Sequence, residues 1–494
     1  FFFQIMPVLW CLIWFCLQVV AQDTQCGSSP GCQKYEADRA KLVQLSRSQS
    51  FDSGIVLTDT EKQANQVLIH LRDDFRSMYN PRLQYNPQQK VIEGSLLFSV
   101  LDRMPKGAIL HLHALGTIDL SVKALTRDDC YVCYSDKFLT DGMQLGFSAN
   151  GPPVAVQNAS AWAKCTSQPS DFESRVRGAM LFTSPPASSV SKTAMWELFD
   201  STIAFTTTPL LYLPHWQDVA CQALEAWAKG GTRHIELRQN LEGAFRGADG
   251  TILPPDTLID TYLGNVNNCS SGVDSISFII ALRRDADEPT MRAAVQETIR
   301  LQKKYGNAVI LGFDIDSEED RFHSLSFYAD LFVQSGLKFF FHAGETRNNL
   351  HSEDNTFSAL ALNSSRIGHG FSLRDHPALA EVMKSRQTGL EVCPLSNQVL
   401  RLVAGLDDHP AYGFAAAGVP LSISPDDPII YGYSSSTADW TAITGAWNLT
   451  LPFLKQACKN SLTTAAGPAN TPEAMAQWAS EWDLWVEWLA SADL

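Results

Sequence analysis

Residues 109–116 read ILHLHALG, an apolar run that carries two histidines one residue apart. In a strand, successive side chains point to opposite faces, so His111 and His113 share one face and the leucines occupy the other. Two imidazoles on one face of a buried strand are costly to desolvate unless something binds them. The stretch therefore predicts a buried strand with a ligand-binding end, and the residue that follows it is Ala114.

This run is the first of eight short apolar runs, and segments with helical spacing separate most of them. Strands that alternate with helices pair in parallel, and eight is the number that closes a (β/α)8 barrel. We therefore predict an α/β fold, a TIM-type (β/α)8 barrel. The eight predicted strands are AILHLHALG (108–116), HIELRQNL (234–241), SISFIIAL (275–282), AVILGFDID (308–316), LKFFFHAGE (337–345), RIGHG (366–370), GLEVCPLSN (389–397) and VPLSISPDD (419–427).

Two additions to the barrel are expected. Residues 22–100 are polar and helical in pattern, which predicts an N-terminal helical extension. The gap between the first two strands is too long for one crossover helix, and its part 126–195 is rich in Ser, Pro and Cys. We interpret 126–195 as an inserted subdomain, so that the catalytic barrel comprises 101–125 and 196–494.

The first 21 residues are interpreted as upstream sequence plus a signal peptide. Residues 6–21, MPVLWCLIWFCLQVVA, form an apolar run that ends in a small residue, and FFFQI precedes Met6. We therefore expect a secreted, extracellular protein with no membrane span in its mature form. N-x-[ST] triplets predict glycosylation, and they begin at Asn158, Asn268, Asn363 and Asn448.

The cysteines fit an oxidising compartment. Of the 11 in the chain, two leave with the signal peptide, so at least one of the remaining nine stays unpaired or pairs between chains. Cys26 and Cys32 are a plausible local pair. Cys130, Cys133 and Cys165 lie in one segment, where we expect one disulfide.

The net charge of −15 argues against nucleic acid as a partner, because no basic surplus is available to neutralise phosphates. A small anionic ligand held by a few local groups is still compatible with this charge.

Polar side chains gather where the predicted strands end. Parallel strands of a barrel bring these ends to one mouth, where the active sites of this fold lie. Three histidines and one carboxylate form a good Zn2+ set with a vacant position for water. We assign His111, His113, His342 and Asp426 as ligands of one Zn2+ per chain, and this leaves Glu345, His369 and Asp427 for proton transfer.

One buried histidine alone is more often a hydrogen-bonded core residue than a ligand. The adjacent pair Asp426 and Asp427 is harder to explain by packing, because like charges at a strand end repel. The conjunction of all these groups at one face of the barrel favours the metal site. Other histidines lack such a context, and we interpret them as structural or surface residues: His70, His215, His234, His351, His376 and His409.

Five motifs in this order resemble the adenosine and AMP deaminase family, and within it the secreted branch of adenosine deaminase-related growth factors. The similarity extends from about residue 100 to about 460. The motifs are MPKGAILHLHALG, FFFHAGET, SSRIGHGFSL, LEVCPLSNQVL and ISPDDP.

The resemblance implies a TIM-type barrel of the metal-dependent hydrolase kind. It also implies a zinc hydrolase that converts adenosine, and 2'-deoxyadenosine, to inosine and ammonia. It implies the same four ligands, with Glu345 of the HAGE motif protonating purine N1 and thereby making C6 electrophilic. His369 of IGHG and Asp427 would orient and deprotonate the attacking water. Trp196 resembles an aromatic wall of the substrate pocket, although a core tryptophan is an equally good interpretation.

The same branch has a dimerising N-terminal region and an insert that binds a cell-surface receptor or glycan. The resemblance therefore implies a homodimer formed through 22–100 and a receptor-binding role for 126–195. Within the insert it favours a disulfide between Cys133 and Cys165 over one between Cys130 and Cys165.

The chain departs from the family pattern at two positions. Adenosine deaminases usually carry an aspartate near the ribose where this chain has Ala114, and AMP deaminases carry alanine there. A glycine usually presents its backbone N–H to the purine where this chain has Ser317, which keeps the N–H and adds bulk.

Three functions therefore stay open. The first is a secreted adenosine deaminase. The second is a deaminase of 5'-AMP or of a broad range of adenine nucleosides and nucleotides. The third is a catalytically inactive secreted signalling or binding protein, which would have no physical reason to keep clustered histidines and paired aspartates.

Overall fold

The computed structural model describes residues 30–183, 191–240, 245–346 and 350–492. Its centre consists of two four-stranded parallel sheets, in the orders β1-β5-β6-β7 and β11-β10-β9-β8. The strands are β1 (Gly107–Leu112), β5 (Thr232–Asn240), β6 (Ser275–Arg283), β7 (Ile310–Asp316), β8 (His342–Ala343), β9 (Arg366–His369), β10 (Gly389–Val392) and β11 (Leu421–Ile423).

Isolated parallel bridges join the two sheets along both edges. Leu112 pairs with Asp426 beyond β11, and Phe313 of β7 pairs with Phe339 before β8. The eight strands therefore close into a barrel, which confirms the predicted TIM-type fold. Every residue of β1 and of β7 is buried, as expected for parallel strands covered on both faces.

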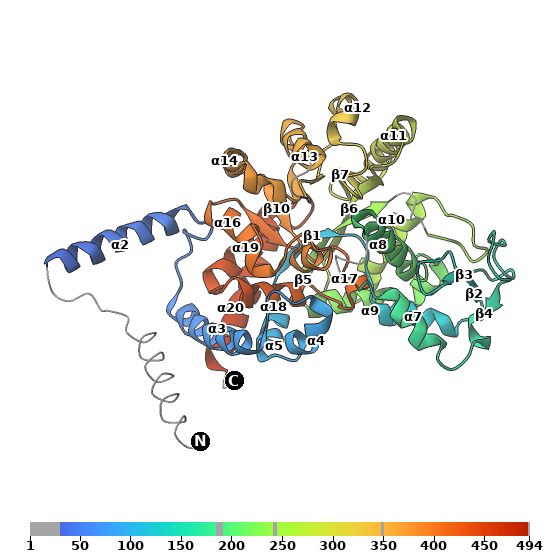
Figure 1. Cartoon of the computed structure of the whole chain (residues 1–494), viewed down its shortest axis with the longest axis horizontal. Helices are drawn as coiled ribbons and strands as arrows, with labels where there is room; N and C mark the ends of the chain where they lie inside the picture. The colour runs from blue at the N-terminus through green and yellow to red at the C-terminus, as the bar shows by residue number, and fades with distance from the viewer. Residues whose placement is uncertain (1–29, 184–190, 241–244, 347–349, 493–494) are drawn as a thin grey trace, which may run out of the picture.

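Helices surround the barrel, and α11 to α14 lie along one side of it (Figure 1). Between consecutive strands of the barrel lie α9 (Leu213–Lys229), α10 (Pro255–Asn268), α11 (Glu288–Tyr305), α12 (Ala329–Ser335), α13 (Leu350–Ala361), α14 (Pro377–Arg386), α15 (Pro394–Val399) and α16 (Ala411–Ala416). The chain after β11 adds α17 (Pro428–Tyr431), α18 (Thr437–Ala446), α19 (Leu451–Thr463) and α20 (Pro472–Ser491).

Helix α11 shows why such segments fold as they do. The Asp287 side chain accepts a hydrogen bond from the backbone N–H of Thr290 and so caps the first turn. Gly306 ends the helix at a φ of 84°, which glycine adopts without strain. One stripe with the helical repeat is buried against the barrel, namely Met291, Ala294, Val295, Thr298 and Leu301.

Most of the N-terminal extension packs on the barrel. It contains α2 (Pro30–Gln49), α3 (Asp59–Met78), α4 (Tyr85–Glu93) and α5 (Leu96–Asp102). Thr58 and Glu61 form a capping box at the start of α3, which buries Leu68 and Phe75 and contacts α20. Helix α2, by contrast, projects away from the body of the molecule (Figure 1).

The segment between β1 and β5 forms a small sheet with its own core. Strands β2 (Cys130–Tyr134), β3 (Met143–Phe147) and β4 (Ala163–Lys164) pair antiparallel in the order β3-β2-β4. Helix α7 (Phe172–Met180) buries Val176 in that core. The chain reaches the insert through α6 (Ile118–Lys123) and returns through α8 (Lys192–Thr207).

The disulfide of the insert joins Cys130 to Cys165, with their Cα atoms 5.4 Å apart, so the predicted pairing of Cys133 with Cys165 is wrong. Cys130 and Cys133 are three positions apart on β2, and their side chains therefore point to opposite faces of the strand. The face of Cys130 packs in the core that contains Cys165, and Cys133 is free and buried.

A second disulfide, between Cys221 of α9 and Cys269 after α10, was not predicted. Cys393 and Cys458 are free and buried. The proposed pair of Cys26 with Cys32 and the signal peptide involve residues outside the described part of the chain. All four sequon asparagines are exposed, and no described helix combines the length and the apolar character needed to cross a bilayer.

Candidate metal and substrate site

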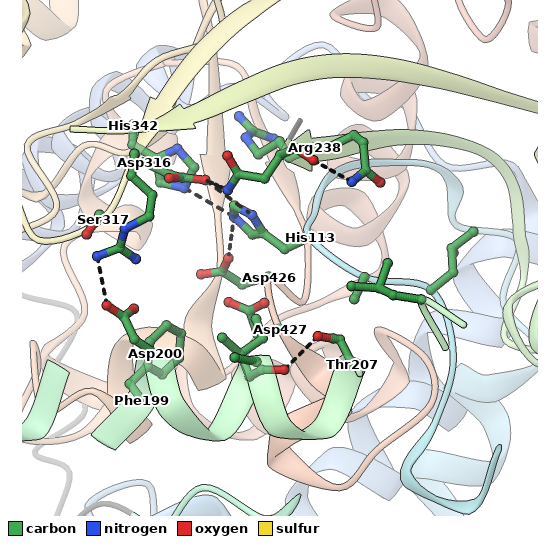
Figure 2. Close-up of a pocket in the computed structure, with 18 of the residues that line it drawn as sticks. His113, Phe199, Asp200, Thr207, Arg238, Asp316, Ser317, His342, Asp426 and Asp427 are labelled. Atoms are coloured by element: carbon green, nitrogen blue, oxygen red, sulfur yellow. Dashed lines mark hydrogen bonds and ion pairs between the residues drawn. The ribbon is translucent and has the colours of Figure 1, made fainter. Parts of the chain in front are cut away.

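The predicted site residues meet at the mouth of the barrel, in and beneath a cavity of about 410 Å³. His111 and His113 come from the end of β1, and His342 comes from β8. His369 ends β9, and Asp426 and Asp427 follow β11. Figure 2 shows His113, His342, Asp426 and Asp427 converging opposite α8, which lines the other side of the cavity.

Four side chains point their polar atoms at one small volume. Asp426 Oδ1 lies 3.2 Å from His111 Nε2 and 3.2 Å from His113 Nε2. His113 Nε2 is 3.3 Å from His342 Nε2, and the four ligand atoms all lie within 4.8 Å of one another. The buried Nε2 of His111 makes no hydrogen bond within the described chain. Nitrogens and an oxygen gathered in this way fit a bound cation.

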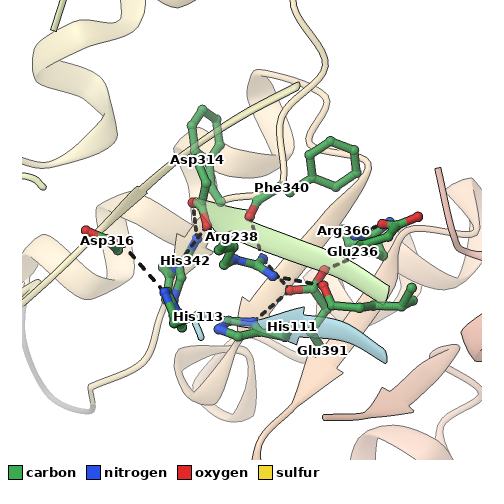
Figure 3. Close-up of polar contacts among 12 residues, drawn as sticks. His111, His113, Glu236, Arg238, Asp314, Asp316, Phe340, His342, Arg366 and Glu391 are labelled. Atoms are coloured by element: carbon green, nitrogen blue, oxygen red, sulfur yellow. Dashed lines mark hydrogen bonds and ion pairs between the residues drawn. The ribbon is translucent and has the colours of Figure 1, made fainter. Parts of the chain in front are cut away.

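Carboxylates behind two of the histidines set their tautomers. His111 Nδ1 lies 2.8 Å from Glu391 Oε2, and His342 Nδ1 lies 2.7 Å from Asp314 Oδ2 (Figure 3). A carboxylate accepts a hydrogen bond, so each Nδ1 carries the hydrogen and each Nε2 presents its lone pair to the metal position.

A buried guanidinium connects these two carboxylates. Arg238 of β5 donates to Asp314 at 2.7 Å and to Glu391, and it also donates to the carbonyl oxygens of Leu110 and Phe340. Arg366 of β9 continues the cluster, donating to Glu391 and to Glu236 at 2.6 Å each. All these charged side chains are almost completely buried.

Sequence reasoning missed this cluster, which we call the buried charge cluster: Glu236, Arg238, Asp314, Arg366 and Glu391. A sequence feature that could have revealed it is the presence of charged residues inside otherwise apolar strands, as in HIELRQN and ILGFDID. A charge in such a strand needs a buried partner of opposite sign.

The proton-transfer candidates lie beside the metal position. Burial, reinforced by the charges of Asp426 and Glu319, holds the pKa of Glu345 well above its usual range and so favours the protonated carboxyl group. His369 Nε2 is 3.7 Å from Glu345 Oε1 and 3.8 Å from Asp426 Oδ2. Burial, with the neighbouring Asp426 charge, also raises the pKa of Asp427.

The predicted substrate-binding residues line the same cavity. Trp196 on α8 is buried, packs on Phe199 with ring centroids 5.5 Å apart, and has an indole N–H without a partner in the described chain. It is therefore both a packed residue and a wall of the cavity. Ser317 adopts a φ of 86°, and its buried hydroxyl also lacks a partner there. Ala114 lines the cavity as well.

Comparison with known proteins agrees with this geometry. The family model for adenosine deaminase matches residues 184–482. Adenosine deaminase 2 of Sus scrofa is 32% identical over 483 residues, which cover 91% of this chain and 94% of that protein. This chain belongs to the adenosine deaminase family. Adenosine deaminase 2-A of Danio rerio is 30% identical over 96% of this chain and 97% of its own length, which supports the adenosine deaminase 2-like branch.

Solved structures support the fold of this adenosine deaminase family member. An adenine deaminase from Arthrobacter aurescens has a TM-score of 0.56 at 21% identity and covers 78% of this chain and 99% of its own. An amidohydrolase from Burkholderia ambifaria, solved with bound Zn, has a TM-score of 0.58 at 18% identity and covers 80% of this chain and 95% of its own. As a member of this family the protein is a hydrolase.

The contacts behind the histidines yield a prediction. In Glu391→Gln the partner of His111 loses its charge, so metal affinity should fall by about 10–100-fold, as is typical when such a supporting partner is changed. Competition with a chelator measures this affinity. Glu236→Gln is the matched control, because Glu236 pairs with Arg366 and contacts no predicted ligand. Equal losses in the two variants would contradict the assignment.

Proposed function

We propose that this protein is a secreted, zinc-dependent adenosine deaminase, which hydrolyses adenosine and 2'-deoxyadenosine to inosine and ammonia. The observation that carries the proposal is the inward-facing set of His111, His113, His342 and Asp426, with the buried carboxyl group of Glu345 at the same cavity. A loss of adenosine absorbance, as adenine becomes hypoxanthine, tests it directly.

Zinc suits the site, because imidazole and carboxylate are good Zn2+ ligands and three histidines with one aspartate leave a position open. When bound, Zn2+ supplies Lewis-acid chemistry that lowers the pKa of water. The purified protein should hold about one Zn2+ per chain. Full activity in a zinc-free preparation would contradict the proposal.

The remaining steps belong to side chains of this chain. Glu345 donates its proton to purine N1, which draws electrons from C6 and opens it to attack. His369 and Asp427 orient the attacking water, and one of them accepts the proton that its oxygen loses on bonding to C6. That proton passes to the C6 amine, the C6–N bond breaks and ammonia departs, and the remaining hydroxyl proton returns to Glu345 as the C6 carbonyl forms.

Replacing Glu345 by Gln tests the proton donor. An amide of the same size cannot transfer a proton to N1, so kcat should fall by about 10²–10⁴-fold while zinc content and fold persist. Glu381→Gln on the exposed face of α14 is the control, and it should keep normal kcat. Near-normal turnover of Glu345→Gln would assign the proton to another group.

Three residues are proposed to hold the substrate. Trp196 offers an aromatic face and an unpaired indole N–H, and Asp427 has an Oδ1 without a hydrogen bond in the described chain. Ser317 offers its backbone N–H, and its unpaired hydroxyl adds a second polar group at the same place. An unpaired buried hydroxyl is costly, which favours a bond between this group and a ligand.

The alternative substrate, 5'-AMP, is favoured by two cavity residues. Ala114 places no carboxylate at the position where adenosine deaminases carry an aspartate. Arg246 also lines the cavity, is exposed, and pairs with no carboxylate of the described chain. Against a phosphate stand the acidic side chains of the same cavity, including Asp200 and Asp316.

Substituting Ala114 by Asp distinguishes the two substrates. A new carboxylate should repel a 5'-phosphate, because anions a few Å apart in a protein interact by several kcal/mol at an effective dielectric of about 20. The ratio of kcat/KM for adenosine over AMP should therefore rise at least tenfold, which corresponds to about 1.4 kcal/mol. Ala114→Asn matches the size without the charge. An equal rise in Ala114→Asn, or no rise in Ala114→Asp, would contradict the charge argument.

An inactive signalling protein is the weaker alternative. Several buried ionisable groups of the cavity, such as Asp427 and Glu345, are kept at a cost in desolvation. A working active site explains this cost, whereas burial of these groups brings no structural benefit that we can identify.

We further propose that α2 forms the interface of a homodimer. It projects from the body and exposes apolar side chains, with Leu42 67% and Leu45 61% exposed. These two leucines are three positions apart and therefore share one face of the helix. A contiguous exposed apolar face is typical of an interaction site.

Full-length protein with Leu42→Glu and Leu45→Glu should be monomeric by light scattering, because charge on this face opposes its burial. The full chain is needed because α3 packs in the barrel core, so removing residues 22–100 would damage the fold. Val56→Glu is the control, since Val56 is 87% exposed and lies outside α2. A stable dimer of the double variant would place the interface elsewhere.

Secretion follows from the predicted signal peptide at 6–21, and the exposure of all four sequon asparagines is compatible with glycosylation. The antiparallel sheet of the insert remains our proposed receptor- or glycan-binding element.

A further inference from the structure

Hydrogen bonds link three buried side chains in series: His409, Asn397 and His369. His369 lines the cavity, whereas His409 lies outside it. His409 Nδ1 accepts a hydrogen bond from the backbone N–H of Ala411 at 3.2 Å. His409 Nε2 lies 3.2 Å from Asn397 Oδ1, and Asn397 Nδ2 lies 3.1 Å from His369 Nδ1. Asn397 belongs to α15, and all three side chains are at most 5% exposed. Water therefore has little access to compete for these bonds.

The backbone N–H gives this chain a direction. A backbone N–H can only donate, so His409 Nδ1 must accept, and the neutral ring carries its hydrogen on Nε2. Burial lowers the pKa of His409 to about 3, which agrees with a neutral ring. Its Nε2–H donates to the oxygen of Asn397, so the amide nitrogen of Asn397 faces His369 and donates to His369 Nδ1.

The result is a tautomer opposite to that of the ligand histidines. His111 and His342 donate from Nδ1 to carboxylates and present Nε2 lone pairs. His369 Nδ1 instead accepts from an amide, so the neutral ring carries its hydrogen on Nε2. That Nε2 lies 3.7 Å from Glu345 Oε1 and makes no hydrogen bond in the described chain.

We propose that Asn397 and His409 are positioning residues, which hold His369 in the tautomer that donates a hydrogen bond from Nε2. His369 then orients the oxygen of the attacking water by donating to it and cannot accept its proton in this tautomer. Of the two groups that share the proton of water in the proposed function, this leaves Asp427, which lines the same cavity. This inference rests on the proposed function. It assigns separate roles to His369 and Asp427, which in the proposed function share the orientation and deprotonation of water.

Nitrogen-15 NMR of full-length, metal-loaded protein labelled at histidine tests the tautomer without any turnover. Pyridine-type and pyrrole-type ring nitrogens have distinct shifts, and His369→Gln identifies the signals of His369. We expect His369 Nδ1 to be pyridine-type and Nε2 to be pyrrole-type. A pyrrole-type Nδ1 in the unaltered protein would overturn the proposal, whether or not adenosine is the substrate.

Asn397→Asp links the tautomer to catalysis. A carboxylate accepts from both rings, so His369 Nδ1 should become pyrrole-type, and kcat should fall at least tenfold with a smaller change in KM. His409→Gln can still donate to Asn397 and should keep Nδ1 pyridine-type with most of kcat. A changed tautomer with unchanged kcat would refute the positioning role.

Gln398→Leu is the matched control on the same helix. Gln398 donates from its side chain to the carbonyl oxygens of Pro81 and Leu83, at 2.8 and 2.9 Å, and does not contact His369. Its loss should lower Tm while leaving the His369 signals and kcat unchanged. Loss of kcat in this variant to the same degree as in Asn397→Asp would show that damage to α15 alone explains the effect. A further outcome separates this inference from the proposed function. If neither the unaltered protein nor any variant deaminates adenosine, but His369 has the expected tautomer, then the proposed function is wrong. The inferred direction of the hydrogen bonds from His409 through Asn397 to His369 still holds in that case.

Discussion

The geometry of the proposed metal site depends on one buried guanidinium. Arg238 contacts both Glu391 and Asp314, and these carboxylates hold His111 on β1 and His342 on β8. These two predicted ligands belong to different sheets of the barrel, so Arg238 couples their orientations across its interior. Removing one member of a buried ion pair typically costs about 3–5 kcal/mol, because the partner charge is left uncompensated. The cluster therefore contributes to the stability of the barrel and to the orientation of the predicted metal ligands.

The charge balance of this cluster favours a cation above it. Its two guanidinium groups face three carboxylates, which gives the cluster one net negative charge. Two of these carboxylates, Glu391 and Asp314, lie directly behind the predicted ligands His111 and His342. Asp426 adds a second negative charge in contact with two of the predicted ligand histidines. Without a cation, the negative charges of these carboxylates and the lone pairs of the histidine Nε2 atoms would repel one another, because little water reaches this region to screen them. Burial, with the charge of Asp426, also raises the pKa of Glu345, which lies at the same site.

The eight strands, and the convergence of their carboxyl ends at one site, could be predicted from the sequence, because apolar periodicity and parallel topology constrain both. The sequence could not predict which side chains pair with each other when they come from different elements. Cys130 and Cys133 could not be separated without knowing which face of β2 packs on the insert core. Cys221 and Cys269 lie 48 residues apart, with no local pattern to join them. His409 was interpreted as structural, since its link to the site passes through Asn397 on another element.

Backbone strain coincides with the proposed chemistry. His369 and Asp426 both have a φ of 65°, and Ser317 has a φ of 86°, in a region that non-glycine residues rarely occupy. Each such residue costs on the order of 1 kcal/mol or more, so the surrounding structure must hold it in place. For His369 the constraint is visible, because Gly370 continues the left-handed turn and Asn397 holds the ring from behind. The turn directs the imidazole into the cavity and the hydrogen bond sets which nitrogen carries the hydrogen, so position and tautomer are specified by separate contacts.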